Sequence, residues 1–378
     1  MDIQLLVRKI NARRALTALL VAGVAGTSGY LALTQSRAAT SATASELENG
    51  AITSPASAVD SQGAAGNKAV KFDVASTSVT GLIVSPSGND SSGNGSANAP
   101  YKTFTKAISA ATAGTTIYAR AGTYNEKFSV TKSGSSGKPI TIGSYPGEKA
   151  IVVGGAATSY DQPIISLKGI SYVTIQDLEV KDITNDGTGI TALDSNNIII
   201  KNNVVHNIAH GAINVSGSNI TIDNNEVYDA CMANQNGAFG SGGWPPAITT
   251  KRASNGSSTN INITNNKVNR NWGEGIDAWF LDGGLIEGNR STNNFAVNIY
   301  ADESKNLRII NNYVGSDSGQ LVPGRKQGVV ISSETGAVYP TNMIINGNTN
   351  GGGLEEIFVW HHNGVKTLTQ SPNPQDMP

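Results

Sequence analysis

Short alternating apolar segments, each closed by an asparagine, recur along the second half of the chain. They read IIIKNN (198–203), ITIDNN (220–225), INITNN (261–266), GLIEGN (284–289), LRIINN (307–312) and MIINGN (343–348). Apolar residues at every second position are typical of a strand with one buried face. An asparagine after such a strand tolerates the left-handed backbone of a sharp bend, and asparagines stacked in register can hydrogen-bond to one another. The repeat therefore predicts one short strand and one stacked asparagine per unit.

A second short strand is predicted at a similar place in each repeat. The segments are GITAL (189–193), AINVS (212–216), AITTK (247–251), GIDAW (275–279), NIYAD (298–302), VVIS (329–332) and EIFVW (356–360). The closing asparagines, from position 203 to position 348, are 22, 41, 23, 23 and 36 residues apart. A unit this small cannot bury its own apolar face, so the copies must stack. We expect an all-β fold, a right-handed parallel β-helix (a solenoid), with the longer gaps as loops inserted between coils.

Side chains alternate between the inside and the outside of this second strand. The two predicted inward columns are Ile190, Ile213, Ile248, Ile276, Ile299, Val329, Ile357 and Ala192, Val215, Thr250, Ala278, Ala301, Ile331, Val359. The two predicted outward columns are Thr191, Asn214, Thr249, Asp277, Tyr300, Val330, Phe358 and Leu193, Ser216, Lys251, Trp279, Asp302, Ser332, Trp360. The inward columns are expected to form the core, and the outward columns one exposed sheet.

Aromatic and charged side chains gather in the outward columns on three successive coils. Because neighbouring coils lie about 4.8 Å apart, Lys251, Trp279 and Asp302 should form a line beside Asp277 and Tyr300. Aromatic rings stack on the apolar face of a pyranose, and charged groups hold its hydroxyls and carboxylates. The pattern predicts a polysaccharide site, although exposed aromatics can also form ladders that only stiffen a sheet.

Two residues outside the columns complete the predicted site. Trp244 lies in the insertion GAFGSGGWPP (237–246) and is expected to form a wall of a cleft. Arg252 follows Lys251, and if the two heads stay close it disfavours the charged form of the lysine. The predicted substrate-binding residues are Arg252, Trp244, Trp279 and Tyr300.

The N-terminus is not expected to belong to the β-helix. Basic residues between positions 8 and 14 precede the apolar run 15–33, which is typical of an export signal or a membrane anchor. Segment 39–78 is small and polar and reads as a disordered linker. The predicted organisation is a signal or anchor over 1–38, a linker over 39–78, the β-helix domain over 79–363 and a polar tail over 364–378. The protein is expected to be secreted or tethered to a surface, with membrane contact only through its N-terminal segment.

Charge and cysteine content narrow the classes of partner. The net charge of −1 argues against nucleic acid, but leaves room for a local basic site for an acidic sugar. Cys231 is the only cysteine, so neither an intrachain disulfide nor a metal-thiolate cluster can form. His206 and His210 form no zinc-binding pattern and are expected to be satisfied or solvated. We expect a monomer whose partner is a polysaccharide.

The segment before the repeats carries a family resemblance. The stretch IVSPSGNDSSGNGSANAPYKTFTKAISAATAGTTIYARAGTYNE (83–126) resembles the opening of secreted β-helix proteins of the pectate-lyase-like superfamily. It is most similar to family 9 pectate lyases and to their alginate lyase and chondroitinase relatives, and the resemblance covers roughly residues 80–362. Within it, YKTFTKAISAATAG (101–114) has the pattern of an amphipathic helix through Phe104, Ile108 and Ala111. Such a helix would cap the open end of the solenoid.

The first mechanistic hypothesis is a lyase that cleaves a uronate-containing glycan by β-elimination. This reaction needs a base for the proton beside the carboxylate and a cation to stabilise the enediolate. Lys251 is the predicted base, and Asp277 and Asp302 complete the predicted catalytic set. The resemblance implies a Lys or Arg base with Ca²⁺ bridging the substrate carboxylate. The oxygen ligands available for such an ion are Glu274, Asp277, Asp302 and Glu303.

Two alternatives remain open on the sequence alone. A glycoside hydrolase needs two carboxylates, one of them protonated, and Asp277 and Asp302 on adjacent coils could serve. A non-catalytic β-helix that binds glycans or has a structural role would also fit a surface-tethered chain. Replacement of Lys251 distinguishes these classes, because it abolishes turnover in a catalyst and weakens only binding in a lectin-like protein.

Overall fold

The computed structural model describes residues 79–160, 162–240, 243–315, 327–351 and 354. It also gives the backbone of five short strands outside these ranges, β1 (Tyr30–Leu31), β2 (Ala56–Asp60), β3 (Lys68–Phe72), β29 (Glu356–Trp360) and β30 (Leu368–Gln370). Strand β3 pairs antiparallel with β1 and β2 in a small separate unit. The predictions for 1–38, 39–78 and 364–378 otherwise lie outside the described residues. Among the residues described, no helix has the length and apolar character needed to cross a membrane.

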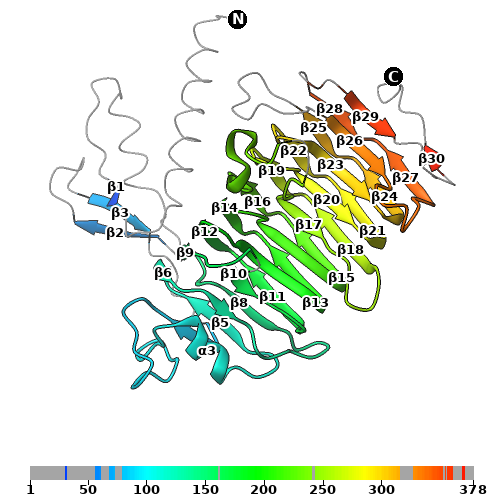
Figure 1. Ribbon diagram of the computed structural model, residues 1–378. Coiled ribbons are helices and arrows are strands. Elements are labelled where there is room, and N and C mark those ends of the chain that lie inside the picture. Colours follow the sequence, from blue (N-terminus) through cyan, green and yellow to red (C-terminus); the bar gives the residue numbers. More distant parts are fainter. Residues whose placement is uncertain are drawn as a thin grey trace, which may run out of the picture. The chain divides into compact units, whose positions relative to one another are not determined.

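The main unit is a right-handed parallel β-helix whose coils stack along one axis (Figure 1). Each coil contributes strands to three faces. Face 1 contains β7 (Phe128–Ser129), β10 (Pro163–Ser166), the first halves of β13 (Thr188–Lys201) and β15 (Ile213–Asp223), β17 (Ile248–Thr250), β20 (Ile276–Trp279), β23 (Val297–Asp302), β26 (Gln327–Ser332) and β29. These strands are parallel, and face 1 carries the second strand of the predicted repeat.

The other two faces are formed in the same way. Face 2 contains β4 (Leu82–Val84), β5 (Thr116–Ala119), β8 (Ile140–Ser144), β11 (Ser171–Gln176), the second halves of β13 and β15, β18 (Ser258–Thr264), β21 (Leu281–Glu287), β24 (Lys305–Ile310), β27 (Met343–Asn346) and β30. Face 3 contains β6 (Gly122–Asn125), β9 (Ala150–Ala156), β12 (Leu178–Thr184), β14 (Val204–Ile208), β16 (Glu226–Tyr228), β19 (Lys267–Asn269), β22 (Arg290–Thr292), β25 (Tyr313–Gly315) and β28 (Thr349–Asn350).

The predicted inward columns of face 1 form the core. Backbone pairing aligns the first column from Ile190 to Val329, and its members are buried. The prediction is wrong at the last coil, where Val329 pairs with Phe358 and not with Ile357. Four consecutive apolar residues in EIFVW fit either register equally well, so alternation could not fix this strand.

The stacked asparagines are confirmed. Each buried closing asparagine except the last donates from its side-chain amide to the Oδ1 of the next, over 2.9–3.0 Å. The members are Asn203, Asn225, Asn266, Asn289, Asn312 and Asn348. The left-handed backbone belongs to the residue just before, which is Asn or Gly in every case, for example Asn265 with φ 55° and Gly288 with φ 65°. One residue of each pair therefore makes the bend and the other fills the ladder.

The predicted capping helix is α3 (Phe104–Ala110). The Thr103 hydroxyl caps its N-terminus by accepting from the backbone N–H of Lys106. Phe104 and Ile108 are buried, and the Phe104 ring stacks on Phe128 with centroids 4.6 Å apart. The helix therefore covers core residues at the N-terminal end of the solenoid.

Candidate active site

Face 1 is bordered by the longest described insertion, residues 229–247, between β16 and β17. It contains the short 3₁₀ helix η2 (Met232–Gly237), whose Asn234 donates to the Trp272 carbonyl over 2.6 Å. The buried Cys231 thiol donates to the Pro245 carbonyl over 2.7 Å, so the cysteine has a structural role. Trp244 meets Phe295 edge to face at 5.8 Å. The insertion is therefore anchored at both ends, and it holds Trp244 at the border of face 1.

The outward columns of face 1 are less exposed than predicted. Every described member of the column that runs from Thr191 to Val330 is buried. In the second column, Trp279 is 36% exposed and Lys251 is half-buried, whereas Asp302 is only 6% exposed. The loop after β26 causes part of this burial, because the backbone N–H of Glu334 donates to Asp302 over 3.1 Å. Sequence alternation gives the direction of a side chain but not what covers it.

Asp277 and Asp302 lie on adjacent strands, as predicted. Backbone pairing sets Asp277 opposite Tyr300 and Trp279 opposite Asp302. Burial raises the pKa of Asp277 well above its ordinary range, and the negative charges of Glu274 and Asp302 raise it further. Burial likewise raises the pKa of Asp302 to about 6, although the N–H of Glu334 opposes the shift. The pKa of Asp277 is therefore well above its ordinary range, whereas Asp302, with a pKa of about 6, is mainly ionised at neutral pH.

The hydrogen bonds around Asp277 agree with a neutral carboxyl group. Its Oδ1 is buried and finds no hydrogen-bond partner among the described residues. Its Oδ2 lies 3.4 Å from the Thr249 hydroxyl, which lies closer, at 2.7 Å, to the Thr250 carbonyl. A hydroxyl has only one proton to donate, so the long contact in which Thr249 donates to Asp277 compensates the carboxyl group only weakly. An ionised carboxylate in this place would be poorly compensated.

Tyr300 is not the exposed sugar platform that the sequence suggested. Its ring is 7% exposed and packs with Val297 and Val330. Its hydroxyl donates to Glu334 over 2.7 Å. Burial and then this hydrogen bond raise the pKa of Tyr300. The structure therefore gives Tyr300 a supporting position beneath the loop after β26.

Glu303 faces a different environment from Asp302. It adopts a left-handed conformation with φ 50° at the bend after β23, and it is fully buried. Both carboxylate oxygens accept from the loop that follows β26, at Ser333, Thr335 and Val338. Burial acts to raise the pKa of Glu303, but these hydrogen bonds outweigh it and the pKa is lowered. Glu303 therefore anchors this loop and does not join Asp277.

The predicted calcium ligands do not converge. Within the described ranges, no three His, Cys, Asp or Glu side chains come close enough together to hold one metal ion. Glu274 is near enough for its charge to raise the pKa of Asp277, and Glu303 is occupied elsewhere. Among the predicted ligands, the Oδ1 of Asp277 is buried and has no hydrogen-bond partner within the described ranges. The described residues therefore do not form a calcium site as they stand.

Lys251 and Arg252 contact different aromatic rings. Strand β17 ends at Thr250 because the Thr250 hydroxyl, and not the backbone, bonds to the N–H and carbonyl of Trp279 at 2.9 Å each. Beyond this break, the Lys251 Nζ lies 5.6 Å from the ring centre of Tyr160, and the Arg252 guanidinium lies 5.1 Å from that of Phe280. The two cations therefore diverge, and the contact that would disfavour a charged Lys251 is not made.

Three residues missed by the sequence analysis lead away from Lys251 in series, from Tyr160, which Lys251 contacts, through His210 to Asp186. The His210 ring centre lies 4.1 Å from that of Tyr160, and the His210 Nε2 lies 2.9 Å from the Asp186 Oδ1. His210 is only 4% exposed, whereas Tyr160 is 41% exposed. Tyr160 and Asp186 lie in turns between repeats, outside every column, so spacing could not have selected them. His210 was expected to be satisfied or solvated, and it is buried with one carboxylate partner.

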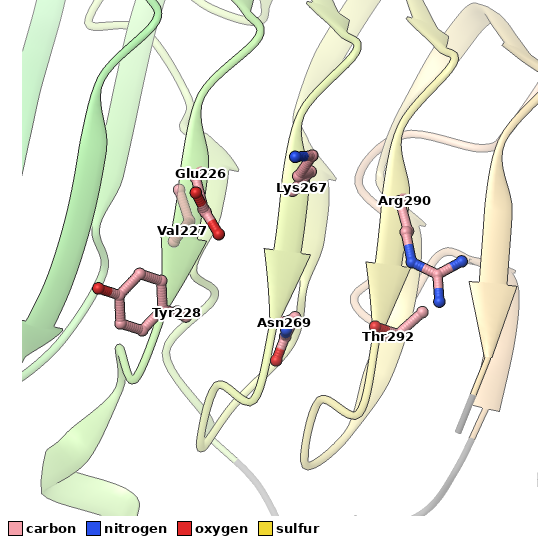
Figure 2. A pocket seen from close by; sticks show the side chains of 7 residues that line it. All are labelled: Glu226, Val227, Tyr228, Lys267, Asn269, Arg290 and Thr292. Carbon is pink, nitrogen blue, oxygen red and sulfur yellow. The ribbon is translucent and has the colours of Figure 1, made fainter. Parts of the chain in front are cut away.

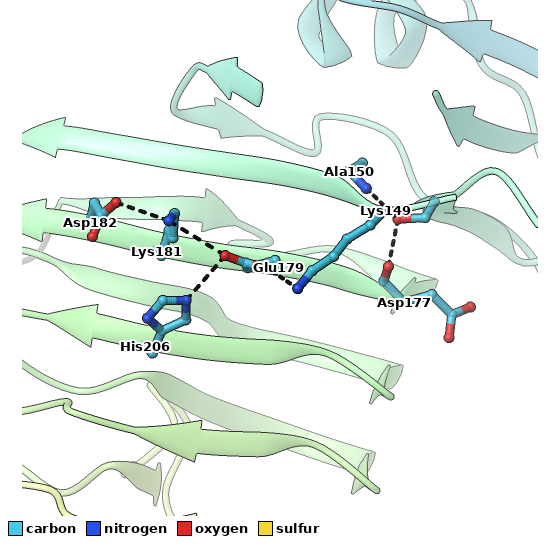
Figure 3. A network of polar contacts seen from close by, with 8 residues as sticks. Lys149, Ala150, Asp177, Glu179, Lys181, Asp182 and His206 are labelled. Atoms are coloured by element: carbon cyan, nitrogen blue, oxygen red, sulfur yellow. Dashed lines mark hydrogen bonds and ion pairs between the residues drawn. The ribbon is translucent and has the colours of Figure 1, made fainter. Parts of the chain in front are cut away.

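Face 3 carries charged residues of a different kind. The buried Glu179 on β12 is contacted by Lys149, by Lys181 at 3.5 Å and by His206 at 3.3 Å (Figure 3). His206 is thus satisfied, as predicted, and its ring also stacks on Tyr228 at 4.7 Å.

A pocket lies farther along face 3, on β16, β19 and β22 (Figure 2). Its lining residues are Glu226, Val227, Tyr228, Lys267, Asn269, Arg290 and Thr292.

Comparison with known proteins agrees with this architecture. Residues 82–307 match the family described as Pel9A-like, right handed beta helix region, and residues 249–369 match a second right handed beta helix region. The uncharacterized protein YwoF of Bacillus subtilis is 37% identical over 135 residues, which cover 34% of this chain and 29% of that protein. Pectate lyase PEL9 of Emericella nidulans is 32% identical over 129 residues, which cover 31% of this chain and 30% of that protein.

The solved structure of pectate lyase Pel9A is similar in fold, with a TM-score of 0.53 at 16% identity over 78% of each chain. The two sequence relatives are matched over less than a third of their own lengths, so the alignments say nothing of their remaining parts. The matched family covers more than half of this chain, through all coils from β4 to β24. The chain belongs to the Pel9A-like right-handed β-helix family.

Proposed function

We propose that this protein is a polysaccharide lyase that cleaves an acidic, uronate-containing glycan by β-elimination. The observation that carries the proposal is the composition of face 1 around Lys251. A lysine and a partly exposed tyrosine lie within 5.6 Å of each other, an exposed Trp279 lies on the next coil, and two carboxyl groups with raised pKa follow. The similarity to pectate lyases of the same fold supports the choice of an acidic glycan.

The chemistry makes three demands on the site. A group must remove the proton from the sugar carbon beside the carboxylate, a positive charge must stabilise the resulting enediolate, and the leaving oxygen must receive a proton. Lys251 and Tyr160 are the two groups near each other that can supply a cation and a proton acceptor. The raised pKa of Asp277 favours its neutral form, which repels an incoming uronate less than an ionised carboxylate does.

Trp279 supplies the surface on which a sugar ring can rest. It is exposed enough to be reached, and its edge packs on Phe280 with ring centres 5.1 Å apart, which fixes its orientation. Its backbone is tied to the Thr250 side chain on the previous coil. A rigid, partly exposed indole beside a cation suits a pyranose that carries a carboxylate.

A second candidate is glycoside hydrolysis, which the carboxyl pair favours. The pKa of Asp277 is raised well above its ordinary range and that of Asp302 is raised to about 6, so Asp277 could serve as the acid and Asp302 as the base. Both groups are largely buried, and the Asp302 Oδ1 already accepts from Glu334. The lyase is preferred because Lys251, Tyr160 and Trp279 are the more accessible groups of this face.

The experiment is an incubation of the full chain with pectate, alginate and glycosaminoglycans, with calcium and with chelator. A rise in ultraviolet absorbance from unsaturated uronates on one polymer supports the lyase and identifies its substrate. New reducing ends without that absorbance support the hydrolase. Neither product on any polymer, with retained binding, supports a non-catalytic glycan-binding protein. Loss of activity with chelator would support calcium supplied to the site, for which Asp277 is the first ligand to test.

The basic and apolar N-terminus supports a secreted or surface-attached protein.

A further inference from the structure

We propose that face 3 carries a second glycan-binding site, which holds a carboxylate-bearing segment of an acidic polysaccharide across the coils from β14 to β22. The site consists of two adjoining pockets that share Glu226 and Lys267. One is the pocket on β16, β19 and β22 (Figure 2), and the other lies beside it, at the bend that leads into β14, β16 and β19. Lys251 and Trp279 lie on face 1, so this site goes beyond the proposed reaction. Binding to it can be measured whether or not face 1 cleaves the polymer.

The outward residues of this site follow from the asparagine ladder. The residue after each ladder asparagine begins a strand of face 3, and it is Glu226 in β16, Lys267 in β19, Arg290 in β22 and Tyr313 in β25. Backbone pairing places these four in one column, and the residue that follows each of them is buried. The repeat therefore sets a carboxylate, two cations and an aromatic ring side by side on successive coils, about 4.8 Å apart.

Lys267 supplies a positive charge that a ligand can use. Its side chain is exposed and borders both pockets. Two other cations on or beside face 3, Lys181 and Arg270, each contact a carboxylate. Lys267 forms no ion pair with any residue in the described part of the chain, although Glu226 is its neighbour in the column. An anionic ligand therefore gains the attraction of Lys267 without first breaking an ion pair.

Arg290 extends the positive charge by one coil. It is in register with Lys267, and its guanidinium group lies 4.1 Å from the ring centre of Tyr313. A guanidinium group that stacks on a ring is restricted in orientation, and its donors match the geometry of a carboxylate. Lys267 and Arg290 thus form a short row of positive charge along the stacking direction of the coils (Figure 2).

A second row of polar side chains lies beside these charges. Tyr228, Asn269 and Thr292 are in register, two residues farther along the same strands (Figure 2). The Oδ1 of Asn269 is buried and has no hydrogen-bond partner among the described residues, so the amide can turn toward a ligand without breaking a bond of this oxygen. The Tyr228 ring is held by its stack on His206. Part of the wall is therefore formed before a ligand arrives, which lowers the entropic cost of binding.

This combination favours an acidic glycan over other ligands. A uronate has a carboxylate for Lys267 and Arg290, and hydroxyl groups for polar side chains such as Asn269. An unbranched polysaccharide repeats these groups at a regular interval, as the coils repeat theirs. A neutral glycan would leave the two cations without an anion, and nucleic acid binding depends on many phosphate contacts, which two cations do not supply. Glu226 repels a carboxylate, so its charge should weaken binding of this ligand.

The test is calorimetric titration of the full chain with saturated hexasaccharides of galacturonate and of mannuronate. All proteins carry Lys251→Gln, which is expected to prevent cleavage during the titration. Lys267→Gln should weaken one binding step about tenfold, and adding Arg290→Gln should weaken the same step about 100-fold in total. Raising the salt concentration should weaken this step as well, because the charges are exposed.

Two matched variants and a neutral ligand serve as controls. Lys168→Gln removes the same charge from an exposed lysine in the turn between β10 and β11, outside face 3, and should leave binding unchanged. Glu226→Gln should strengthen the step that Lys267→Gln weakens, because it removes a repelling charge. Maltohexaose, which has no carboxylate, should not bind at this step. Unfolding midpoints equal to that of the parent protein show that each variant is folded.

Three outcomes overturn the proposal. Binding curves that Lys267→Gln and the double variant leave unchanged show that the uronate does not bind on face 3. An equal loss with Lys168→Gln shows only a general attraction of charge. Equal binding of maltohexaose, or weaker binding after Glu226→Gln, contradicts an acidic ligand. Failure of the proposed lyase function is a separate result, because it appears as a lack of unsaturated product from the wild type.

Discussion

The protonation of Asp302 gives a prediction whose magnitude follows from its environment. Burial raises its pKa to about 6, from an ordinary value of about 3.9 in an unfolded chain. Each pKa unit corresponds to about 1.4 kcal/mol, so ionising this group in the folded protein costs up to about 3 kcal/mol. Because the pKa of Asp302 is raised in the folded state, its ionisation does not lower the free energy of unfolding below about pH 4. The free energy of unfolding then falls as the pH rises through about 6. Above pH 7 the cost is complete.

The variant Asp302→Asn removes this cost, because an amide cannot ionise. Its oxygen can still accept from the backbone N–H of Glu334. We expect the variant to be more stable relative to wild type at pH 8 than at pH 4. The difference between their free energies of unfolding should increase by up to about 3 kcal/mol between the two pH values. Urea unfolding at the two pH values measures this difference, and any fixed effect of the amide cancels in it. A difference between variant and wild type that is the same at pH 4 and pH 8 would refute the reasoning.

Three further predictions concern the ladder, the sugar platform and face 3. Asn266→Ala leaves buried donors and acceptors of its neighbours unpaired and should lower the free energy of unfolding by about 3 kcal/mol. The control Asn262→Ala changes a half-exposed residue outside the ladder and should alter it little. Equal urea midpoints for the two variants would contradict this. Trp279→Ala should weaken glycan binding about tenfold in titrations with unchanged stability, and unchanged affinity would exclude it from the site. Burial acts to raise the pKa of Glu179, but hydrogen bonds from Lys149 and His206 outweigh it and the pKa is lowered. Glu179→Gln should therefore destabilise at pH 7, with a deficit that shrinks as the pH falls below 4; a constant deficit would contradict it.

The fold was predictable because its signal repeats. The alternating triplets predicted one strand of each coil, and the asparagine after each triplet predicted the turn. The hydrogen-bonded ladder from Asn203 to Asn348 confirms the predicted stacking of these asparagines. The register of face 1 followed from the same alignment as far as Val329. It failed at EIFVW, where an unbroken apolar run contains no alternation to read.

The candidate site was only partly predictable, for a physical reason. Lys251, Asp277 and Asp302 lie in columns, so their neighbours on adjacent coils could be named in advance. The burial of Tyr300 and the occupation of Glu303 depend on the loop after β26, whose folding over face 1 has no repeat to reveal it. Tyr160, Asp186 and His210 lie in turns and bends, and only tertiary structure brings Tyr160 to Lys251 and His210 to Tyr160. Repeats predict which side chains share a column, but not which residues of the turns lie beside them.

The central claim is that face 1 catalyses elimination. The most direct measurement is mass spectrometry of the products from the cleaved polymer in water labelled with heavy oxygen. Elimination breaks the glycosidic bond without water, so the account predicts products with an unsaturated terminal uronate and no heavy oxygen introduced by cleavage. Saturated products that each carry one heavy oxygen at the new reducing end would contradict it and assign the site to hydrolysis by Asp277 and Asp302.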